Sequence, residues 1–223
     1  MHSSQSLTKN FCNKIVRLEN HGHKIEKFSK QLHHPCDIFI NHRGIDTKRT
    51  ISGLLHNHLY RLGLNPFLDN KKMKPGDRLF DKINDAVRHC KVGVAVFSPH
   101  YCESYFCLHE LALMMETRKR VIPIFCDMKP SLLQVKYNGS RTVTDLQRFG
   151  WALEEARCTV GLTFDTLKGD WSEFLTKATD AVVKNLLEVN GIEEEEYIQI
   201  MKLMHMRNPK AYRSIYIKAM YMS

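Results

Sequence analysis

The stretch Val92-Gly-Val-Ala-Val-Phe97, followed at once by Ser98 and Pro99, decides how this chain is expected to fold. A continuous apolar run of this length, ended by turn-forming residues, is typical of a strand buried on both faces of a parallel sheet. In open α/β sheets, ligands bind beyond the carboxyl ends of the strands, where loops and helix N-termini converge. We therefore expect functional side chains in the segment directly after Phe97.

That segment, Ser104-Tyr-Phe-Cys-Leu-His-Glu-Leu-Ala-Leu113, predicts a helix. The apolar stripe of the helix, at helical spacing, consists of Leu108, Leu111, Ala112 and Met115. Glu110 falls off this stripe and shares the other face with Cys107 and Met114. Its position near the positive end of the helix dipole favours the ionised form. Two interpretations follow: a carboxylate available for chemistry, or an ordinary solvated glutamate, which is common on helices.

Further segments extend the alternation of strand and helix on both sides of this pair. Strands are predicted at 37–40, near 66–68, and at 121–125. Helical spacing is shown by three sets of residues: Ile51, Leu54, Leu55, Leu59 and Leu62; Phe80, Ile83, Ala86 and Val87; and Phe174, Leu175, Ala178, Val182 and Leu186. About five alternations predict one α/β domain, a five-stranded parallel sheet with helices on both faces.

Two parts of the chain are less regular. Pro123 lies inside the strand predicted at 121–125, and because proline lacks a backbone donor we expect a bulge or an unused amide position there. From Lys129 to Gly169 the pattern indicates only loops and short helices. Residues 1–34 are polar and basic and are predicted to form a flexible leader. Residues 191–223 form a tail of unclear order, which leaves 35–190 as the folded domain.

Composition narrows the class of protein further. The 223 residues include 33 Lys and Arg and 24 Asp and Glu, and the net charge of +9 favours anionic partners without choosing among them. The seven cysteines include no C-x-x-C pair, which fits a reducing cytoplasm, and no His or Cys cluster has the spacing of a metal site. No apolar run is long enough for a signal peptide or a membrane span. A cytoplasmic protein without a metal is expected.

Several catalytic classes are disfavoured by missing motifs. No G-x-x-x-x-G-K-S/T loop and no G-x-G-x-x-G turn follows any predicted strand, which argues against a P-loop enzyme or a Rossmann dehydrogenase. The glycines of a nucleophile elbow are missing around Ser98. Cys102 and Cys107 lie near His100 and His109, but no third group to orient such a nucleophile is evident.

Three boxes of this sequence resemble those of plant Toll/interleukin-1 receptor (TIR) domains. The segment Asp37-Ile-Phe-Ile-Asn-His-Arg-Gly-Ile-Asp-Thr47 is similar to DVFLSFRGEDT, and 94–111 is similar to VVFSxNYAxSxWCLxEL. The third box, Val121-Ile-Pro-Ile-Phe125, is similar to the VIPIF strand of the family. The resemblance covers roughly 35–190, in matching order and spacing, and implies a flavodoxin-like TIR fold. Because no nucleotide-binding module or leucine-rich repeats follow, a TIR-only protein is expected.

The resemblance also implies an enzyme. Many plant TIR domains cleave NAD+ between nicotinamide and ribose, giving nicotinamide and ADP-ribose or a cyclic isomer such as 2'cADPR, a signal in immunity and cell death. Glu110 falls on their catalytic glutamate. Their NAD+ pocket and its surroundings match Arg43, Gly44, Ile45, Asp46, Thr47, Lys48, Gly76 and Phe106. NAD+ is the substrate here, so no separate cofactor is implied, and activity is linked in the family to self-association into dimers or higher oligomers.

The sequence departs from the family pattern at three places. Phe106 stands where tryptophan is usual, which retains an aromatic face but loses the indole donor. His109 replaces the usual acidic neighbour of the glutamate. Gly53-Leu54 occupies the place of a Ser-His pair through which many plant TIR domains associate, which puts that interface in doubt.

Two other functions remain open at this point. The chain could be a catalytically silent adapter that recruits other TIR proteins, although an adapter does not need a carboxylate at Glu110. Nucleic-acid binding is the other, through Lys71, Lys72, Lys74 and the run Arg118-Lys-Arg120. No aromatic residues are interleaved with these charges, so solubilising surface charge is the better interpretation of them.

Overall fold

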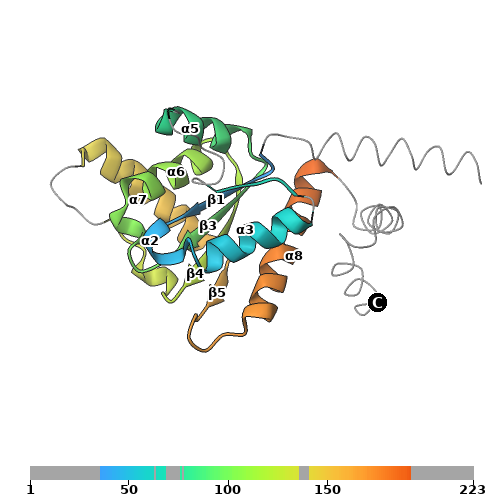
Figure 1. The fold of residues 1–223 in the computed structure, drawn as a ribbon. Helices are drawn as coiled ribbons and strands as arrows, with labels where there is room; N and C mark the ends of the chain where they lie inside the picture. The colour runs from blue at the N-terminus through green and yellow to red at the C-terminus, as the bar shows by residue number, and fades with distance from the viewer. Residues whose placement is uncertain (1–35, 63, 69–75, 77, 136–140, 192–223) are drawn as a thin grey trace, which may run out of the picture. The chain divides into compact units, whose positions relative to one another are not determined.

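The computed structural model describes residues 36–62, 64–68, 76, 78–135 and 141–191 (Figure 1). Their centre is a parallel sheet in the order β2-β1-β3-β4-β5. The strands are β1 (Ile38–His42), β2 (Pro66–Phe67), β3 (Val92–Phe97), β4 (Arg120–Cys126) and β5 (Leu162–Phe164). The predicted five-stranded parallel sheet is therefore confirmed, and its strand order is that of flavodoxin-like folds.

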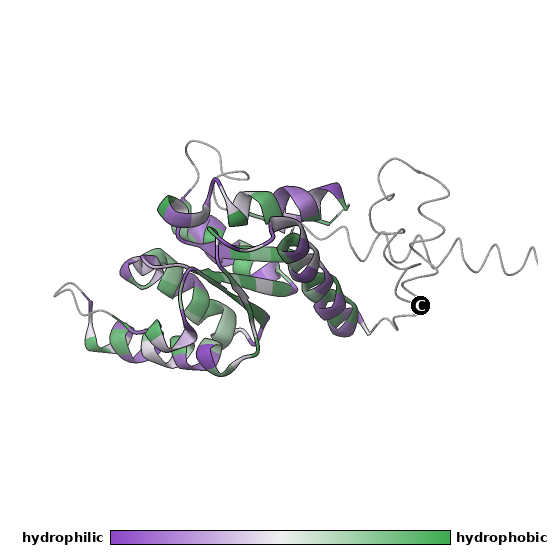
Figure 2. Cartoon of the chain, turned by 90° about the horizontal axis from the view of Figure 1, so that it is seen from below, coloured by the Kyte–Doolittle hydropathy of each residue, from purple (hydrophilic) through white to green (hydrophobic). Residues whose placement is uncertain are grey.

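Helices cover both faces of this sheet, as predicted. One face is covered by α3 (Ile51–Arg61) and α8 (Trp171–Asn190), and the other by α5 (Leu79–His89), α6 (Tyr105–Glu116) and α7 (Val143–Cys158) (Figure 1). The described residues also form three short helices: α2 (Gly44–Thr47), η1 (Tyr101–Glu103) and η2 (Pro130–Leu132). In Figure 2 the helices that cover the two faces of the sheet turn their apolar sides, in green, toward the strands, as expected for helices that bury one stripe.

The strand residues divide the core into two clusters by alternation. In β3, Val92, Val94 and Val96 belong to the cluster under α3 and α8, whereas Ala95 and Phe97 belong to the cluster under α5, α6 and α7. β1 alternates in the same way and pairs with β3 from Ile38↔Val92 to His42↔Val96. This register brings the carboxyl ends of the two central strands to the same edge of the sheet.

The region from 129 to 169 differs from the prediction. It contains α7, a helix of 16 residues, and the edge strand β5. α7 begins at a capping box in which Thr142 and Asp145 exchange hydrogen bonds, and it buries Phe149, Ala152, Leu153 and Ala156 at helical spacing. Two alanines in this stripe and the charged residues around it weaken the apolar signal, which explains why the sequence pattern does not indicate a regular helix there.

Two residues assigned to buried stripes are exposed. Leu54 is 43% exposed because the buried side of α3 includes Ser52 and His56 and is turned away from it. Phe80, also 43% exposed, lies in the first turn of α5, where its ring packs on Phe106 with centroids 4.9 Å apart. Pro123 causes no bulge, since the register of β3 with β4 runs through it and pairing with β5 begins only at Ile124.

Other predictions concern chemistry and the ends of the chain. The six described cysteines form no disulfide with one another, and the described part contains no cluster of three or more potential metal ligands. None of its helices combines the length and apolar character needed to cross a membrane. The predicted leader and almost all of the tail lie outside the described residues, so the domain boundaries stay predictions.

Candidate active site

Glu110 is buried, with only 7% of its surface exposed. α6 buries nearly its whole circumference, including Cys107 and Met114, which the sequence pattern places on an unburied face. Helix α6 packs on the sheet and is flanked by α5 and α7, so its polar positions also face protein. The interpretation of Glu110 as a solvated surface residue is therefore wrong, and a buried carboxylate requires a specific environment.

Asn41, near the carboxyl end of β1, supplies part of that environment. Its Nδ2 donates a hydrogen bond of 2.7 Å to Oε2 of Glu110 and another of 3.0 Å to the carbonyl oxygen of Cys107. Its Oδ1 accepts a hydrogen bond from the hydroxyl of Tyr101. The amide therefore joins the central strand to both η1 and α6, immediately beside the carboxylate.

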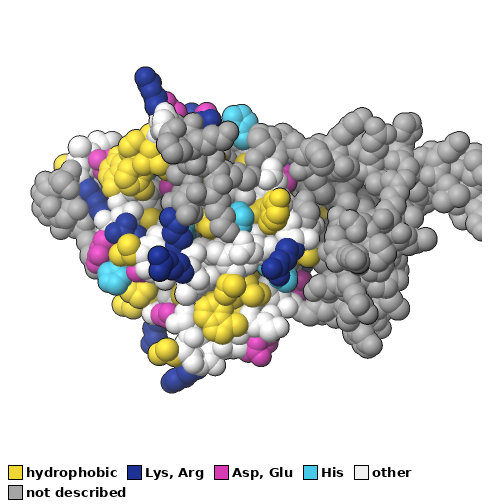
Figure 3. Space-filling model, in the orientation of Figure 1, with side chains coloured by type: hydrophobic (Ala, Val, Ile, Leu, Met, Phe, Trp, Pro, Cys, Tyr) yellow, Lys and Arg dark blue, Asp and Glu magenta, His cyan; other side chains and the backbone are white. Residues whose placement is uncertain are grey.

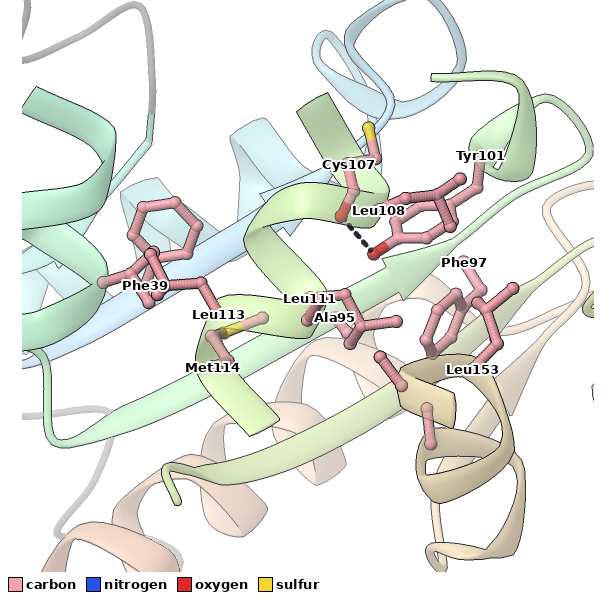
Figure 4. Close-up of a cluster of buried hydrophobic side chains, with 14 of the residues drawn as sticks. Phe39, Ala95, Phe97, Tyr101, Cys107, Leu108, Leu111, Leu113, Met114 and Leu153 are labelled. Atoms are coloured by element: carbon pink, nitrogen blue, oxygen red, sulfur yellow. Dashed lines mark hydrogen bonds between the residues drawn. The ribbon is translucent and has the colours of Figure 1, made fainter. Parts of the chain in front are cut away.

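The Tyr101 side chain closes this network from the other side. Its hydroxyl also lies 3.1 Å from the carbonyl oxygen of Cys107, the contact that Figure 4 draws as a dashed line. Burial raises the pKa of Tyr101 well above its ordinary value, and Cys107 and Glu110 raise it further. Tyr101 is therefore a neutral phenol that donates hydrogen bonds at every physiological pH.

The loop after β1 is fastened to the end of β3 by Asp46. Its Oδ2 accepts hydrogen bonds from Ser98 Oγ at 2.6 Å and from the backbone N–H of His100 at 3.1 Å, and its Oδ1 lies 2.8 Å from Nδ1 of His100. Burial acts to raise the pKa of Asp46, but the bonds from Ser98 and His100 outweigh it and hold this pKa below its ordinary value. Asp46 is thus an ionised anchor at neutral pH.

Thr47 holds the same loop from inside. Its hydroxyl donates to the carbonyl oxygen of Arg43 at 3.2 Å and accepts a bond of 3.0 Å from Ser52. The side chains of Asp46 and Thr47 are thus used for loop structure. Among the other predicted pocket residues, Ile45 is exposed, and Arg43, Gly44 and Lys48 are half-buried at the carboxyl end of β1.

Two predicted site residues, Phe106 and Gly76, remain to be placed relative to Glu110. Phe106 precedes Glu110 by one turn of α6 and lies in an aromatic group with Phe80 and Tyr105 on the partly exposed side of the helix. Gly76 is exposed and has a φ of 96°, a left-handed conformation that glycine adopts without strain. Its neighbours on both sides lie outside the described residues, so its relation to Glu110 stays a prediction.

His109, the departure next to Glu110, has a polar environment of its own. Nδ1 lies 3.0 Å from a guanidinium nitrogen of Arg148, which can only donate, so Nδ1 must accept and Nε2 donates to Oδ1 of Asn84 at 2.9 Å. Arg148 also forms a two-pronged ion pair with Glu116. Burial, together with the charge of Arg148, lowers the pKa of His109. The ring is therefore a neutral link between α5, α6 and α7.

The basic run at the start of β4 is largely engaged in contacts within the domain. Lys119 Nζ donates to the carbonyl oxygen of Arg88, and Arg120 forms an ion pair with Glu188. On the face shown in Figure 3, Lys and Arg side chains are dispersed among hydrophobic and acidic ones instead of forming a continuous tract. The three predicted loop lysines lie outside the described residues. These observations favour the interpretation as ordinary surface charge.

Sequence reasoning missed four residues that organise the site: Asn41, Ser98, His100 and Tyr101. One signal was present, because Asn41 is a polar residue that directly continues the apolar strand segment Ile38-Phe-Ile40, at the end where functional groups collect. The other three contribute through partners about fifty to seventy positions away, which no local pattern reveals.

The sheet order and the glutamate held at the end of its central strands are the arrangement that the resemblance to TIR domains implies. A family model described as "TIR domain" matches residues 38–149, and the chain belongs to this family. It is 47% identical to the "Probable 2' cyclic ADP-D-ribose synthase BdTIR" of Brachypodium distachyon over 171 residues, which are 75% of this chain and 76% of that protein. The predicted family resemblance is thus confirmed.

Two further relatives agree with this assignment. The chain is 28% identical to "TMV resistance protein N" of Nicotiana glutinosa over 172 residues, 69% of this chain but only 15% of that longer protein. Among solved structures it is similar to the TIR domains in the structure of the activated Roq1 resistosome, with a TM-score of 0.57 and 26% identity, covering 66% of this chain and 99% of that one.

Proposed function

We propose that this chain is an NAD+ glycohydrolase and cyclase. It breaks the bond between nicotinamide and ribose and releases nicotinamide with ADP-ribose or a cyclic ADP-ribose isomer. The observation that carries this proposal is the buried carboxylate of Glu110, held by Asn41 at the carboxyl end of the sheet. The 47% identity to a protein named as a 2' cyclic ADP-D-ribose synthase supports the same reaction.

One carboxylate is sufficient for this chemistry. Nicotinamide leaves as a neutral molecule from a pyridinium, so its departure needs no general acid. Positive charge develops on the ribose as the bond breaks, and Glu110 binds the ribose hydroxyls and stabilises that charge. Capture of the ribose carbon by water gives ADP-ribose, whereas capture by another hydroxyl of the same molecule gives a cyclic isomer. NAD+ is consumed as substrate, and the proposal includes no cofactor or metal.

The loop after β1 supplies the binding groups. Arg43 and Lys48 are the basic residues of this loop, and a guanidinium group suits a pyrophosphate because its planar donors match two oxygens at once. The Nε atom of Arg43 is shielded from solvent and has no hydrogen-bond partner among the described residues. A buried polar atom without a partner is unfavourable for stability and is tolerated more readily where a side chain serves binding.

Phe106 contributes an aromatic face one turn before Glu110. Its ring is partly exposed and already packed on Phe80, so one side remains able to stack against a planar base. We assign Gly76 to the loop that, in the family, reaches toward a second copy. Self-association in the cytoplasm activates the enzyme under this proposal, and its product acts as an immune or cell-death signal.

The test compares the purified protein with its Glu110→Ala and Glu110→Gln variants. Each is incubated with NAD+ at concentrations that permit self-association, and nicotinamide and ADP-ribose products are separated by chromatography and identified by mass. Glu110→Gln is the matched control, because the amide oxygen can still accept from Asn41 while the negative charge is lost. Turnover by the wild type alone is the expected result, and the product mass separates cyclase from hydrolase.

The opposite outcome would support the adapter. If neither the wild type nor the variants release nicotinamide, even at concentrations where light scattering shows assembly, the carboxylate has no catalytic role. Equal turnover by wild type and Glu110→Gln would also contradict the proposed mechanism, because charge stabilisation would then be unnecessary.

A further inference from the structure

We propose that Asn41 is a positioning residue that fixes the Glu110 carboxylate for catalysis, an inference that rests on the proposed NAD+ cleavage. Asn41 is fully buried in β1, and its two amide hydrogens are both used, one on Glu110 Oε2 and one on the carbonyl oxygen of Cys107. Because the side chain is fully buried and bonds to the carboxylate, we assign its effect on the reaction to Glu110.

The chemistry around the amide determines which way it points. If the amide were turned over, Oδ1 would face two acceptors, the Glu110 carboxylate and the Cys107 carbonyl, and both contacts would become repulsive. Nδ2 would then lose both of the acceptors that it now serves. The observed orientation, with Oδ1 accepting from Tyr101, satisfies every group at once. The side chain of Asn41 therefore always presents its Nδ2 donor, and not its Oδ1 acceptor, to Glu110.

The amide is held by an interior strand of the sheet. β1 is an interior strand that pairs with β2 on one side and β3 on the other. Asn41 points to the same side of β1 as Phe39, into the core under α6. Tyr101, which fixes the amide oxygen, is itself fully buried against Phe97, as Figure 4 shows. A glutamate side chain has three rotatable bonds, and this support restricts them before substrate arrives.

A purely structural role would not require the contact with Glu110. Tying α6 to β1 needs only the bond from Asn41 to the Cys107 carbonyl, and the Sγ of Cys107 adds a second link to the carbonyl oxygen of His42 at 3.3 Å. The shorter bond of the amide nevertheless goes to the carboxylate. Where the family box quoted above has serine, the longer asparagine side chain of this protein reaches both groups.

The experiment measures kcat and KM for NAD+ in the full-length wild type and in Asn41→Leu, which keeps the side-chain size and removes the donor. Because misplacement of a catalytic group by about 1 Å can reduce a rate about 100-fold, we expect kcat to fall about 10- to 100-fold. KM should change less than about threefold, since the phosphate and base contacts proposed for Arg43, Lys48 and Phe106 do not pass through Asn41. Tyr101→Phe, which leaves the Asn41 donor in place, should lower kcat less.

Phe39→Leu is the matched control for a loss of packing. It changes the same face of the same strand without touching Glu110, and it should lower the thermal midpoint while leaving kcat unchanged. If Asn41→Leu does not fold, Asn41→Ala replaces it, because the methyl group removes the donor and adds no bulk to the core. With that variant kcat should again fall at nearly constant KM.

The outcomes separate this inference from the function on which it rests. A wild type that releases no nicotinamide would overturn both. An active wild type with unchanged kcat in the folded Asn41 variant would overturn the positioning role alone. The positioning role would also fail if Phe39→Leu lost as much kcat as the Asn41 variant at the same thermal midpoint, since the effect would then be structural.

Discussion

Replacement of Asp46 by alanine tests whether the loop after β1 is held in place by a single carboxylate. The wild-type side chain accepts three hydrogen bonds from Ser98 and His100, more than fifty positions away, and is only 13% exposed. Alanine removes all three bonds and leaves the buried Ser98 hydroxyl without this partner. We expect the loop to loosen and the free energy of unfolding to decrease.

The size of the effect follows from the bonds that are lost. A hydrogen bond to a charged group contributes about 1.5 to 3 kcal/mol, and bonds to one shared acceptor are not additive. Water can replace the lost hydrogen bonds of His100, because the side chain of His100 is 54% exposed. Asp46→Ala should therefore lower the free energy of unfolding by about 2 to 4 kcal/mol.

Asp46→Asn provides a control that separates the bonds from the charge. Its amide oxygen can still accept from Ser98 and from the backbone N–H of His100, while its amide nitrogen donates to Nδ1 of a neutral His100. All three contacts survive with a change of tautomer and the loss of one charge. The expected decrease is therefore only about 1 kcal/mol or less.

Urea unfolding of the three proteins gives these differences, and pH gives a second readout. The pKa of Asp46 in the folded protein lies below its ordinary value of 3.8, so the stability from this charge is fully present above that value. It is lost as the pH falls through the lowered pKa. The advantage of wild type over Asp46→Asn should thus shrink below about pH 4. Equal stabilities of wild type and Asp46→Ala at pH 7 would refute the anchoring role.

Two other changes test neighbouring features. Because the pKa of His109 is lowered in the folded protein, the stability contributed by its neutral ring is fully present above the ordinary value of 6.5. This stability is lost as the pH falls through the lowered pKa. Thermal midpoints should therefore fall between pH 7.5 and pH 5 less in His109→Gln than in wild type, and identical slopes would contradict this. Gly53→Ser, half of the family's usual Ser-His pair, should lower the thermal midpoint, because a Cβ at Gly53 would lie 2.5 Å from the carbonyl oxygen of Lys48. An unchanged midpoint would show that the backbone yields there.

The sequence predicts the centre of this fold better than its edge. β1, β3 and β4 each contain a continuous apolar run because helices cover both faces of the sheet, and such runs are visible without any partner. β5 has three residues, of which Thr163 is exposed, and contributes too short a pattern to be noticed. α7 was missed for a different reason, since its stripe contains alanines whose burial depends on how closely the helix approaches the sheet.

The candidate site divides in the same way. Glu110 stands in a motif, so the sequence places it, but its burial could not be read from the stripe of one helix. α6 has protein on nearly every side, and this property belongs to the packing of α5 and α7 around it. The contact from Asn41 to Glu110 spans 69 positions and that from Tyr101 to Asn41 spans 60. Such pairs arise from topology and have no local signature.

The bond between Asn41 and Glu110 also constrains how this domain can change over evolutionary time. Loss of the glutamate would remove a partner from an amide hydrogen in the core, where a buried donor without a partner costs about 1 to 3 kcal/mol. A lineage that abandoned the reaction would thus gain stability by exchanging the asparagine as well. Descendants that retain the asparagine without the glutamate should therefore be rarer than those that have kept both or replaced both.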